Sequence, residues 1–144
     1  MRPTIKAIID TNILISSLLN DLGAPAKLIA HWEQGLFAIV LSDDIFNEYK
    51  RVFLEFTDRV EASKALELLE ALKEKALWVQ PSQKVSVCKD SSDDKFIECA
   101  VVNGAEYLVT KNIRHFPKVY KGVRVVKIRA FLSILDILGD RIVQ

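Results

Sequence analysis

Short apolar runs alternate along the chain with segments whose apolar residues recur at helical spacing. The runs are rich in β-branched residues and end at turn-forming or polar residues, which predicts buried strands. They are 5–9, 36–41, 107–110 and 123–128, with 78–80 as a further candidate. The predicted helices are 11–20, 25–34, 45–56, 59–77, 91–104 and 130–138. This alternation predicts a single α/β domain over residues 1–144 with a mainly parallel sheet of about four to five strands.

Polar residues just beyond the first predicted strand are the first candidates for a functional site. Asp10, Thr11 and Asn12 follow the apolar run directly. In open parallel sheets, ligands bind beyond the carboxyl ends of the strands, where these side chains would lie. The alternative is that Asp10 only caps the next helix, although Thr11 and Asn12 are also suited to start it.

Glu48 is a second candidate because of its place beside an apolar helix stripe. The stripe has helical spacing and consists of Ile45, Tyr49, Val52, Phe53 and Phe56. At about 100° per residue, Glu48 falls on its flank, closer to the core than Asn47, Lys50 or Arg51. A carboxylate there needs a partner, unless it reaches solvent at the edge of the stripe.

The acidic run Asp90–Asp94 contains a third candidate. Asp93 precedes Phe96 and Ile97 by three and four residues, so we expect it to point inward from the first turn of a helix. Ser91 and Asp94 have the spacing of a capping box, which predicts a structural role for Asp94. Asp90 is left open as a turn residue or as an outer acid of the site.

Carboxylates that gather at one sheet edge repel one another unless a cation lies among them. Oxygen ligands without His or Cys favour Mg²⁺ or Mn²⁺ over zinc. The two histidines, His31 and His115, have no ligand spacing, so we expect ordinary structural roles for them. A divalent ion at such a site would activate water and stabilise charge on a phosphate.

The net charge of +1 hides an uneven distribution. Residues 1–72 carry 7 basic and 11 acidic side chains, whereas residues 73–144 carry 13 basic and 8 acidic ones. Positions 111–129 hold seven basic residues and no acidic one. Such a stretch is either a solvated surface or an anion-binding face, and beside a metal site it would suit a phosphate backbone.

Composition excludes several protein classes. With 50% apolar residues and few Gly or Pro, the chain is not a disordered or collagen-like protein. Cys88 and Cys99 are too few for a disulfide scaffold and lack CxxC spacing, which favours a reducing compartment. No export signal or apolar stretch near 20 residues is visible, so we expect a cytoplasmic protein without a membrane partner.

Four blocks of the sequence resemble the PIN-domain ribonuclease family, in the family's order. They are IIDTNILISSLL at 8–19, SDDIFNEYKRV at 42–52, KDSSDDKFIECAVVNGAEYLVTKN at 89–112 and NIRHFP at 112–117. The resemblance implies a Rossmann-like three-layer α/β/α fold with a metal-dependent nuclease site. By position, Asp10, Glu48 and Asp93 match the metal-binding acids, while Asn12 and Thr110 match supporting polar positions. Asn112 stands where the family often has a fourth acid, so a tightly held second metal ion is in doubt.

The sequence is most similar to the toxin group of prokaryotic toxin–antitoxin pairs. The resemblance therefore implies a Mg²⁺- or Mn²⁺-dependent endoribonuclease with a small antitoxin protein as partner and a homodimeric state. Asp10 and Asp93 would bind metal, Glu48 would be a ligand or base, Asn112 a secondary ligand, and Lys111 and Arg114 would contact RNA phosphates. The alternative is a catalytically weak or inactive PIN-like module that binds RNA or a protein partner.

Overall fold

The computed structural model describes residues 4–56, 58 and 60–143, and the side chains of this part up to Leu138. The outer ends of the predicted domain, 1–3 and 144, and the predicted start of the fourth helix at 59 lie outside the described residues. The strands are β1 (Lys6–Ile9), β2 (Ala38–Leu41), β3 (Leu77–Trp78), β4 (Tyr107–Val109), β5 (Val119–Tyr120) and β6 (Val123–Val126). The helices are α1 (Thr11–Leu19), α2 (Ala24–Glu33), α3 (Asp43–Glu55), α4 (Ala62–Lys75), α5 (Asp94–Asn103) and α6 (Ile128–Val143). Two short 3₁₀ turns, η1 (Ser91–Asp93) and η2 (Ile113–His115), precede α5 and follow β4.

The six described strands form one sheet in the order β3-β2-β1-β4-β6-β5. All neighbouring pairs are parallel except β5 with β6. Residues of β1 pair in register with β4, so that Ile9 lies opposite Val109 and the residues that follow both strands meet at one edge. The predicted parallel α/β architecture is therefore confirmed.

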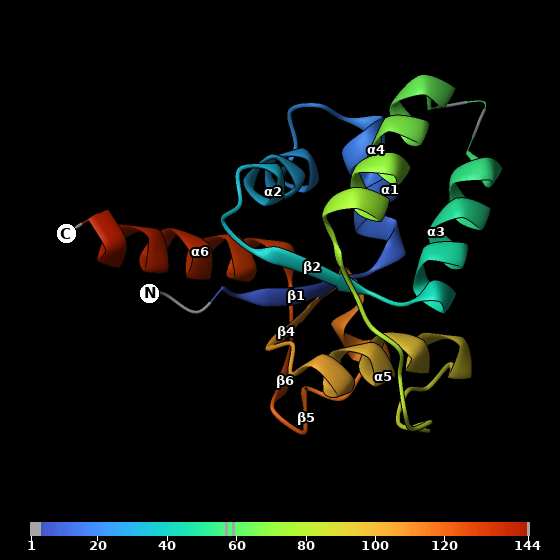
Figure 1. Ribbon diagram of the computed structural model, residues 1–144, viewed down its shortest axis with the longest axis vertical. Helices are drawn as coiled ribbons and strands as arrows, with labels where there is room; N and C mark the ends of the chain where they lie inside the picture. Colours follow the sequence, from blue (N-terminus) through green and yellow to red (C-terminus); the bar gives the residue numbers. More distant parts are fainter. Residues whose placement is uncertain (1–3, 57, 59, 144) are drawn as a thin grey trace.

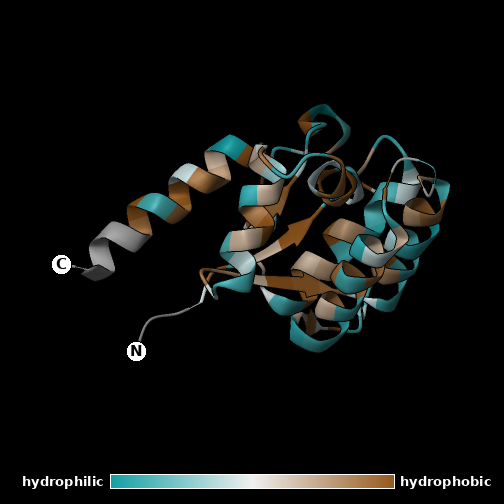
Figure 2. Ribbon diagram, turned by 90° about the horizontal axis from the view of Figure 1, so that it is seen from above, coloured by the Kyte–Doolittle hydropathy of each residue, from teal (hydrophilic) through white to brown (hydrophobic). Residues whose placement is uncertain are grey.

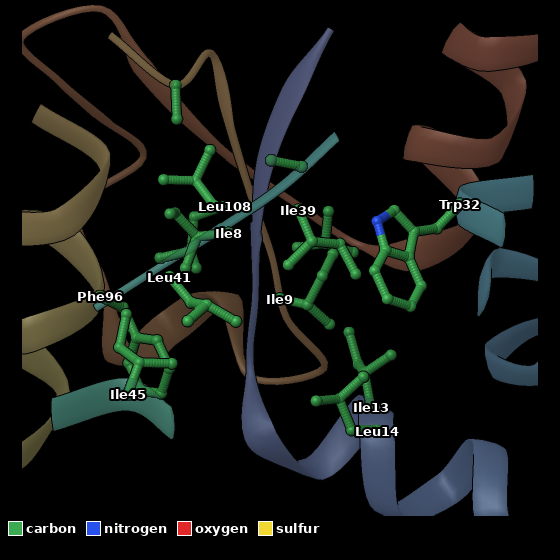
Figure 3. Packing of buried hydrophobic residues seen from close by; sticks show 14 of the residues in the cluster. Ile8, Ile9, Ile13, Leu14, Trp32, Ile39, Leu41, Ile45, Phe96 and Leu108 are labelled. Atoms are coloured by element: carbon green, nitrogen blue, oxygen red, sulfur yellow. The ribbon is translucent and has the colours of Figure 1, made fainter. Parts of the chain in front are cut away.

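Helices cover both faces of the sheet, which gives the three layers of the α/β/α fold. Figure 1 shows α1 and α2 on one side of β1 and β2 and α5 on the other, with α3 rising where β2 ends. Successive residues of a strand point to opposite faces, which explains why the central strands are apolar throughout. Figure 3 shows Ile9 near Ile13 and Leu14 on one side, and Ile8 on the side of Phe96.

The last helix, α6, packs against the core along its described side chains, from Ile128 to Leu138. Phe131 is buried against the rings of Phe37 and Tyr107, with ring centroids 5.1 and 5.5 Å apart. Leu132 and Leu135 are also buried. In Figure 2, apolar and hydrophilic residues alternate along the coloured part of this helix.

The sheet has one strand more than the upper end of the prediction. Strand β5 is two residues long and pairs antiparallel with β6 through the turn Lys121-Gly122. Both turn residues have positive φ, 48° and 85°, as in the tight turns that suit β-hairpins. Because β5 is half exposed and carries no apolar run, hydrophobic patterning does not reveal it.

No single helix among the described residues is long and apolar enough to cross a membrane. The pair α1 and α2 reaches the required length and composition together, with a bend of 102° between the two helices.

Candidate active site

Asp10 lies at the carboxyl end of β1, beside the end of β4. Its backbone N–H donates to the carbonyl oxygen of Val109 at 3.0 Å, which extends the β1–β4 ladder by one residue. The next residue of the neighbouring chain segment, Thr110, donates its hydroxyl to Oδ2 of Asp10 at 2.6 Å. Asp10 is 8% exposed and Thr110 is fully buried. The strand pairing thus holds one carboxylate in a fixed orientation at the sheet edge.

Asp10 occupies the N-cap position of α1, as the alternative interpretation supposes, but its side chain does not cap the first turn. Asp10 has the extended backbone of an N-cap residue before α1, with φ −64° and ψ 144°, but its side chain makes no capping hydrogen bond. The carboxylate faces Thr110 instead.

Glu48 approaches the same edge from α3. Ser42 caps this helix, and the hydroxyl of Tyr49 donates to the carbonyl oxygen of Ile9 at 2.6 Å, which ties α3 to the last residue of β1. Burial raises the pKa of Tyr49 well above its usual value, so the phenol keeps its donating proton. The Glu48 side chain is 15% exposed on the flank of the apolar stripe, as expected.

Glu48 has a partner at each carboxylate oxygen. Oε2 accepts a hydrogen bond from the hydroxyl of Thr11. Oε1 forms an ion pair with the ammonium group of Lys95 at 2.8 Å, and Arg51 lies 3.9 Å from the same oxygen. Sequence reasoning missed Lys95 and counted Tyr49 only as part of the apolar stripe.

Asp93 is the last residue of η1, directly before α5. Its pKa is raised to about 6, first by burial and then by the negative charge of Asp10. Asp90 and Glu48 raise it further, while His115 lowers it from a distance of 3.9 Å between Nδ1 and Oδ2. Asp93 therefore belongs to one electrostatic cluster with Asp10 and Glu48.

Asp94 is structural, but not by the capping box that its spacing predicts. Its side chain is buried, and Oδ1 accepts hydrogen bonds from the backbone N–H groups of Val87 and Cys88 at 3.1 and 2.9 Å. Asp90, rather than Ser91, caps the turn by accepting from the N–H of Ser92 at 2.9 Å. The physical reason is that the 3₁₀ turn η1 begins at Ser91, so the cap position falls on Asp90 instead of Ser91.

Burial and mutual repulsion define the electrostatics of the acidic cluster. Burial raises the pKa of Asp10 most, the hydroxyl of Thr110 lowers it, and the charge of Glu48 raises it again. Among the described residues, no three His, Cys, Asp or Glu side chains are arranged as they stand to hold a metal ion. The donors nevertheless fit a hard divalent cation in kind, because all three are carboxylates and a cation, the ammonium of Lys95, already lies against one of them. A divalent cation would relieve the same repulsion.

Basic and amide side chains lie beyond β4, next to the cluster. A pocket of about 330 Å³ is lined by Lys111, Asn112, Ile113, Arg114, His115 and Lys127. The backbone N–H of Asn112 donates to the Thr110 hydroxyl at 3.0 Å, which leaves the exposed Asn112 side chain beside the site. Lys111 donates to the hydroxyl of Ser16 on α1, and Asn12 is exposed in the first turn of the same helix. Lys127 and His115 were not among the predicted site residues.

The model of the PIN-domain family matches residues 6–114, which is about three quarters of the chain. The chain belongs to the PIN-domain family. PIN domains are generally nucleases and generally use divalent metal ions such as Mg²⁺.

One curated relative is the uncharacterized protein MJ1680 of Methanocaldococcus jannaschii. It is 31% identical over 104 residues, which cover 67% of this chain and 64% of the relative. The chain thus spans a little under two thirds of the length of that relative.

Proposed function

We propose that this chain is a Mg²⁺- or Mn²⁺-dependent endoribonuclease that hydrolyses RNA phosphodiester bonds. The observation that carries the proposal is the buried Asp10 carboxylate, which Thr110 orients; the charge of Glu48 raises the pKa of Asp10, and the charge of Asp10 raises that of Asp93. Burial and neighbouring negative charges raise the pKa values of Asp10 and Asp93, and a structural role does not account for three acids gathered at one edge of the sheet. Membership of a family of nucleases supports hydrolysis as the chemistry.

The roles of the acids follow from their surroundings. Asp10 and Asp93 hold the metal ion, Asp10 in an orientation set by the Thr110 hydroxyl. Glu48, held by Thr11 at one oxygen, serves as a further ligand or as the base that takes a proton from the attacking water. When bound, the ion lowers the pKa of water and neutralises charge on the scissile phosphate.

The basic pocket beside the cluster supplies contacts to the RNA backbone. Lys111 and Arg114 lie on its rim together with Lys127. Asn112 lies between this pocket and Thr110, where its amide would act as a secondary ligand or orient a water molecule. Phosphate contacts of this kind position a strand without reading its sequence.

A toxin role with a small antitoxin partner and a homodimeric state is part of the proposal. It is supported by the resemblance of the four sequence blocks to the toxin group of the family. Co-expression with a protein encoded beside this chain, followed by purification of the complex, tests it. Growth arrest on expression of this chain alone, relieved by that neighbour, is the expected result.

Substitution of Asp10→Asn tests the catalytic proposal. The amide keeps the shape of the side chain and can still bond to Thr110, but it removes the charge that binds metal. We expect RNA cleavage with Mn²⁺ to fall by at least about a hundredfold, with an unchanged circular dichroism spectrum. Equal cleavage by variant and wild type, in nuclease-free preparations, would contradict the proposal.

The second candidate function is a PIN-like module that binds RNA or protein without cutting. Two observations favour it over full activity. Asn112 stands where the family often has a fourth acid, and Lys95 forms an ion pair with Glu48. Calorimetric titration with Mn²⁺ distinguishes the two. Binding that Asp10→Asn abolishes supports the enzyme, whereas no binding at millimolar Mn²⁺ supports the binding module.

A further inference from the structure

Lys95, the second residue of α5, has its ammonium group against the acidic cluster. Its Nζ lies 2.8 Å from Oε1 of Glu48, and the two side chains are 19% and 15% exposed. The ammonium also donates to the carbonyl oxygen of Ser92 and lies 5.4 Å from the ring centroid of Phe96. With Thr11 on its other oxygen, Glu48 has both oxygens engaged by protein groups.

The position of Lys95 does not serve its own helix. The first turn of a helix carries partial positive charge, so a cation there is unfavourable, whereas Asp and Glu are favourable. The helix dipole thus disfavours Lys95 at this position, and the ion pair with Glu48 offsets that cost. A residue that opposes the preference of its helix and contacts a site carboxylate points to a role in the site.

Lys95 also lines a cleft that opens beside the acidic cluster. The cleft has a volume of about 660 Å³ and lies between α3, α5 and the segment around Val85. Glu48 and Lys95 line it together with Arg51 and Lys84, and three further acids are also on its wall: Asp44, Asp94 and Glu98. The ion pair of Lys95 with Glu48 therefore lies at the wall of this cleft.

We propose that Lys95 is a positioning residue whose ammonium neutralises Glu48 in the metal-free site. When a divalent cation binds, the ion pair breaks and the ammonium leaves Glu48. The inference rests on the proposed function and concerns the regulation of the same site. Once released, Lys95 presents its charge to an RNA phosphate in the cleft.

The exchange follows from the charges. When Glu48 contributes to a site for a divalent cation, it cannot also neutralise Lys95 fully. The divalent cation and the Lys95 ammonium then lie close together and repel each other. Lysine suits this exchange because its ammonium is a compact charge on a flexible stem. Because Lys95 becomes free for phosphate only after metal binding, metal and RNA strengthen each other's binding.

Calorimetric titration of the full chain with Mn²⁺ tests the competition. Lys95→Met removes the competing ammonium but keeps the apolar stem, and we expect it to bind Mn²⁺ about three- to tenfold more tightly than the wild type. Lys95→Arg, which keeps a cation, should stay closer to the wild type.

Lys84→Met is the matched control. Lys84 lines the same cleft but forms no ion pair among the described residues. Its substitution removes one positive charge nearby, so it measures the general electrostatic effect. An unchanged Mn²⁺ affinity in Lys95→Met, or an equal gain in Lys84→Met, overturns the proposal.

A short single-stranded DNA, as a probe of phosphate-backbone binding, tests the release. In fluorescence anisotropy, Mn²⁺ should strengthen DNA binding by the wild type more than by Lys95→Met. An equal effect of Mn²⁺ on both proteins contradicts the release of Lys95 into the cleft.

The same Mn²⁺ titration with Asp10→Asn distinguishes failure of the proposed nuclease function from failure of the proposed role of Lys95 alone. If neither the wild type nor Asp10→Asn binds Mn²⁺, the proposed function fails and the role of Lys95 fails with it. If the wild type binds, Asp10→Asn does not, and Lys95→Met equals the wild type, only the role of Lys95 is overturned.

Discussion

The hydroxyl of Thr110 reduces the free-energy cost of burying the Asp10 carboxylate. Thr110 donates to Asp10 and at the same time accepts from the backbone N–H of Asn112, so its oxygen links two chain segments. A buried carboxylate without such a donor is costly. The hydroxyl also holds Asp10 in the orientation in which it faces the cluster.

Thr110→Val should therefore lower both stability and metal binding. The valine keeps the shape but leaves the Asn112 N–H and the Asp10 carboxylate without a partner, at a cost of about 1–2 kcal/mol in the free energy of unfolding. Urea unfolding and Mn²⁺ titration measure the two effects. Thr110→Ser keeps the hydroxyl and should stay close to the wild type in both; a matching loss in the serine variant would contradict this account.

The acidic cluster should make the metal-free protein more stable at mildly acidic pH. The pKa of Asp93 is about 6 in the folded chain and near 3.8 for an ordinary Asp, so the folded state binds the proton more tightly. Its contribution to stability is complete below the lower value and is lost as the pH rises through about 6. Urea unfolding in chelator should show a smaller free energy of unfolding at pH 7.5 than at pH 5.

Asp93→Asn is the control for this pH dependence. It removes the titrating group, and the decrease in stability between pH 5 and 7.5 should become smaller. The same decrease in wild type and variant would mean that Asp93 is not the group responsible.

At the scale of elements, the start of α5 organises the site. The turn η1 places Asp93 toward Asp10 and turns Asp94 back to the segment 85–88, while Lys95 faces Glu48 on α3. Three successive residues thus have three different partners. One short irregular turn thus connects the acidic cluster, the cleft wall and the segment 85–88.

Asp94→Ala should loosen the loop that forms one wall of the cleft. It removes two hydrogen bonds to an ionised acceptor, which should cost about 2–3 kcal/mol in the free energy of unfolding. Faster amide exchange at Val87 and Cys88 in hydrogen-exchange measurements would locate the effect. Asp44→Ala, an exposed position on the same cleft, should leave exchange at these amides unchanged.

The sequence predicts the position of a site residue where a single strand or helix determines that position. The end of the first strand places Asp10, and helical spacing places Glu48 at the edge of its stripe. The partners of these residues depend on how helices pack, and periodicity does not contain that information. Lys95 reaches Glu48 only because α3 and α5 meet beyond the sheet. Its place in the first turn of a helix was the one local signal.

The roles of Asp90 and Asp94 show the same limit. Spacing alone favours a capping box, but the chain turns one residue earlier and Asp90 takes the cap. The hydrogen-bond partners of Asp94, the backbone N–H groups of Val87 and Cys88, come from a segment outside the predicted helices and strands. Such loop contacts are set by tertiary structure.

At the scale of the molecule, the near-neutral net charge conceals one acidic and one basic region. An acidic cluster is formed by Asp10 after β1, Glu48 on α3 and Asp93 at the end of η1, and a basic pocket lies beyond β4. The first suits a divalent cation and the second suits phosphates. Their adjacency is the arrangement that a phosphodiester-cleaving enzyme needs.

The basic pocket should contribute to RNA binding in a salt-dependent way. Lys127→Ala should weaken binding of single-stranded RNA of any sequence and reduce the slope of log affinity against log salt by about 0.7, the value for one phosphate contact. Fluorescence anisotropy at several salt concentrations measures this. Lys27→Ala, on α2, should leave the slope unchanged, and an equal reduction there would argue against a role of the pocket.

A crystal structure of this chain soaked in Mn²⁺ tests the central claim most directly, because anomalous scattering locates the ion. The account predicts a Mn²⁺ ion bound to the carboxylates of Asp10 and Asp93, with the Lys95 ammonium moved away from Glu48. Crystals that hold no ion at these carboxylates in millimolar Mn²⁺ would contradict a metal-dependent nuclease site in this chain.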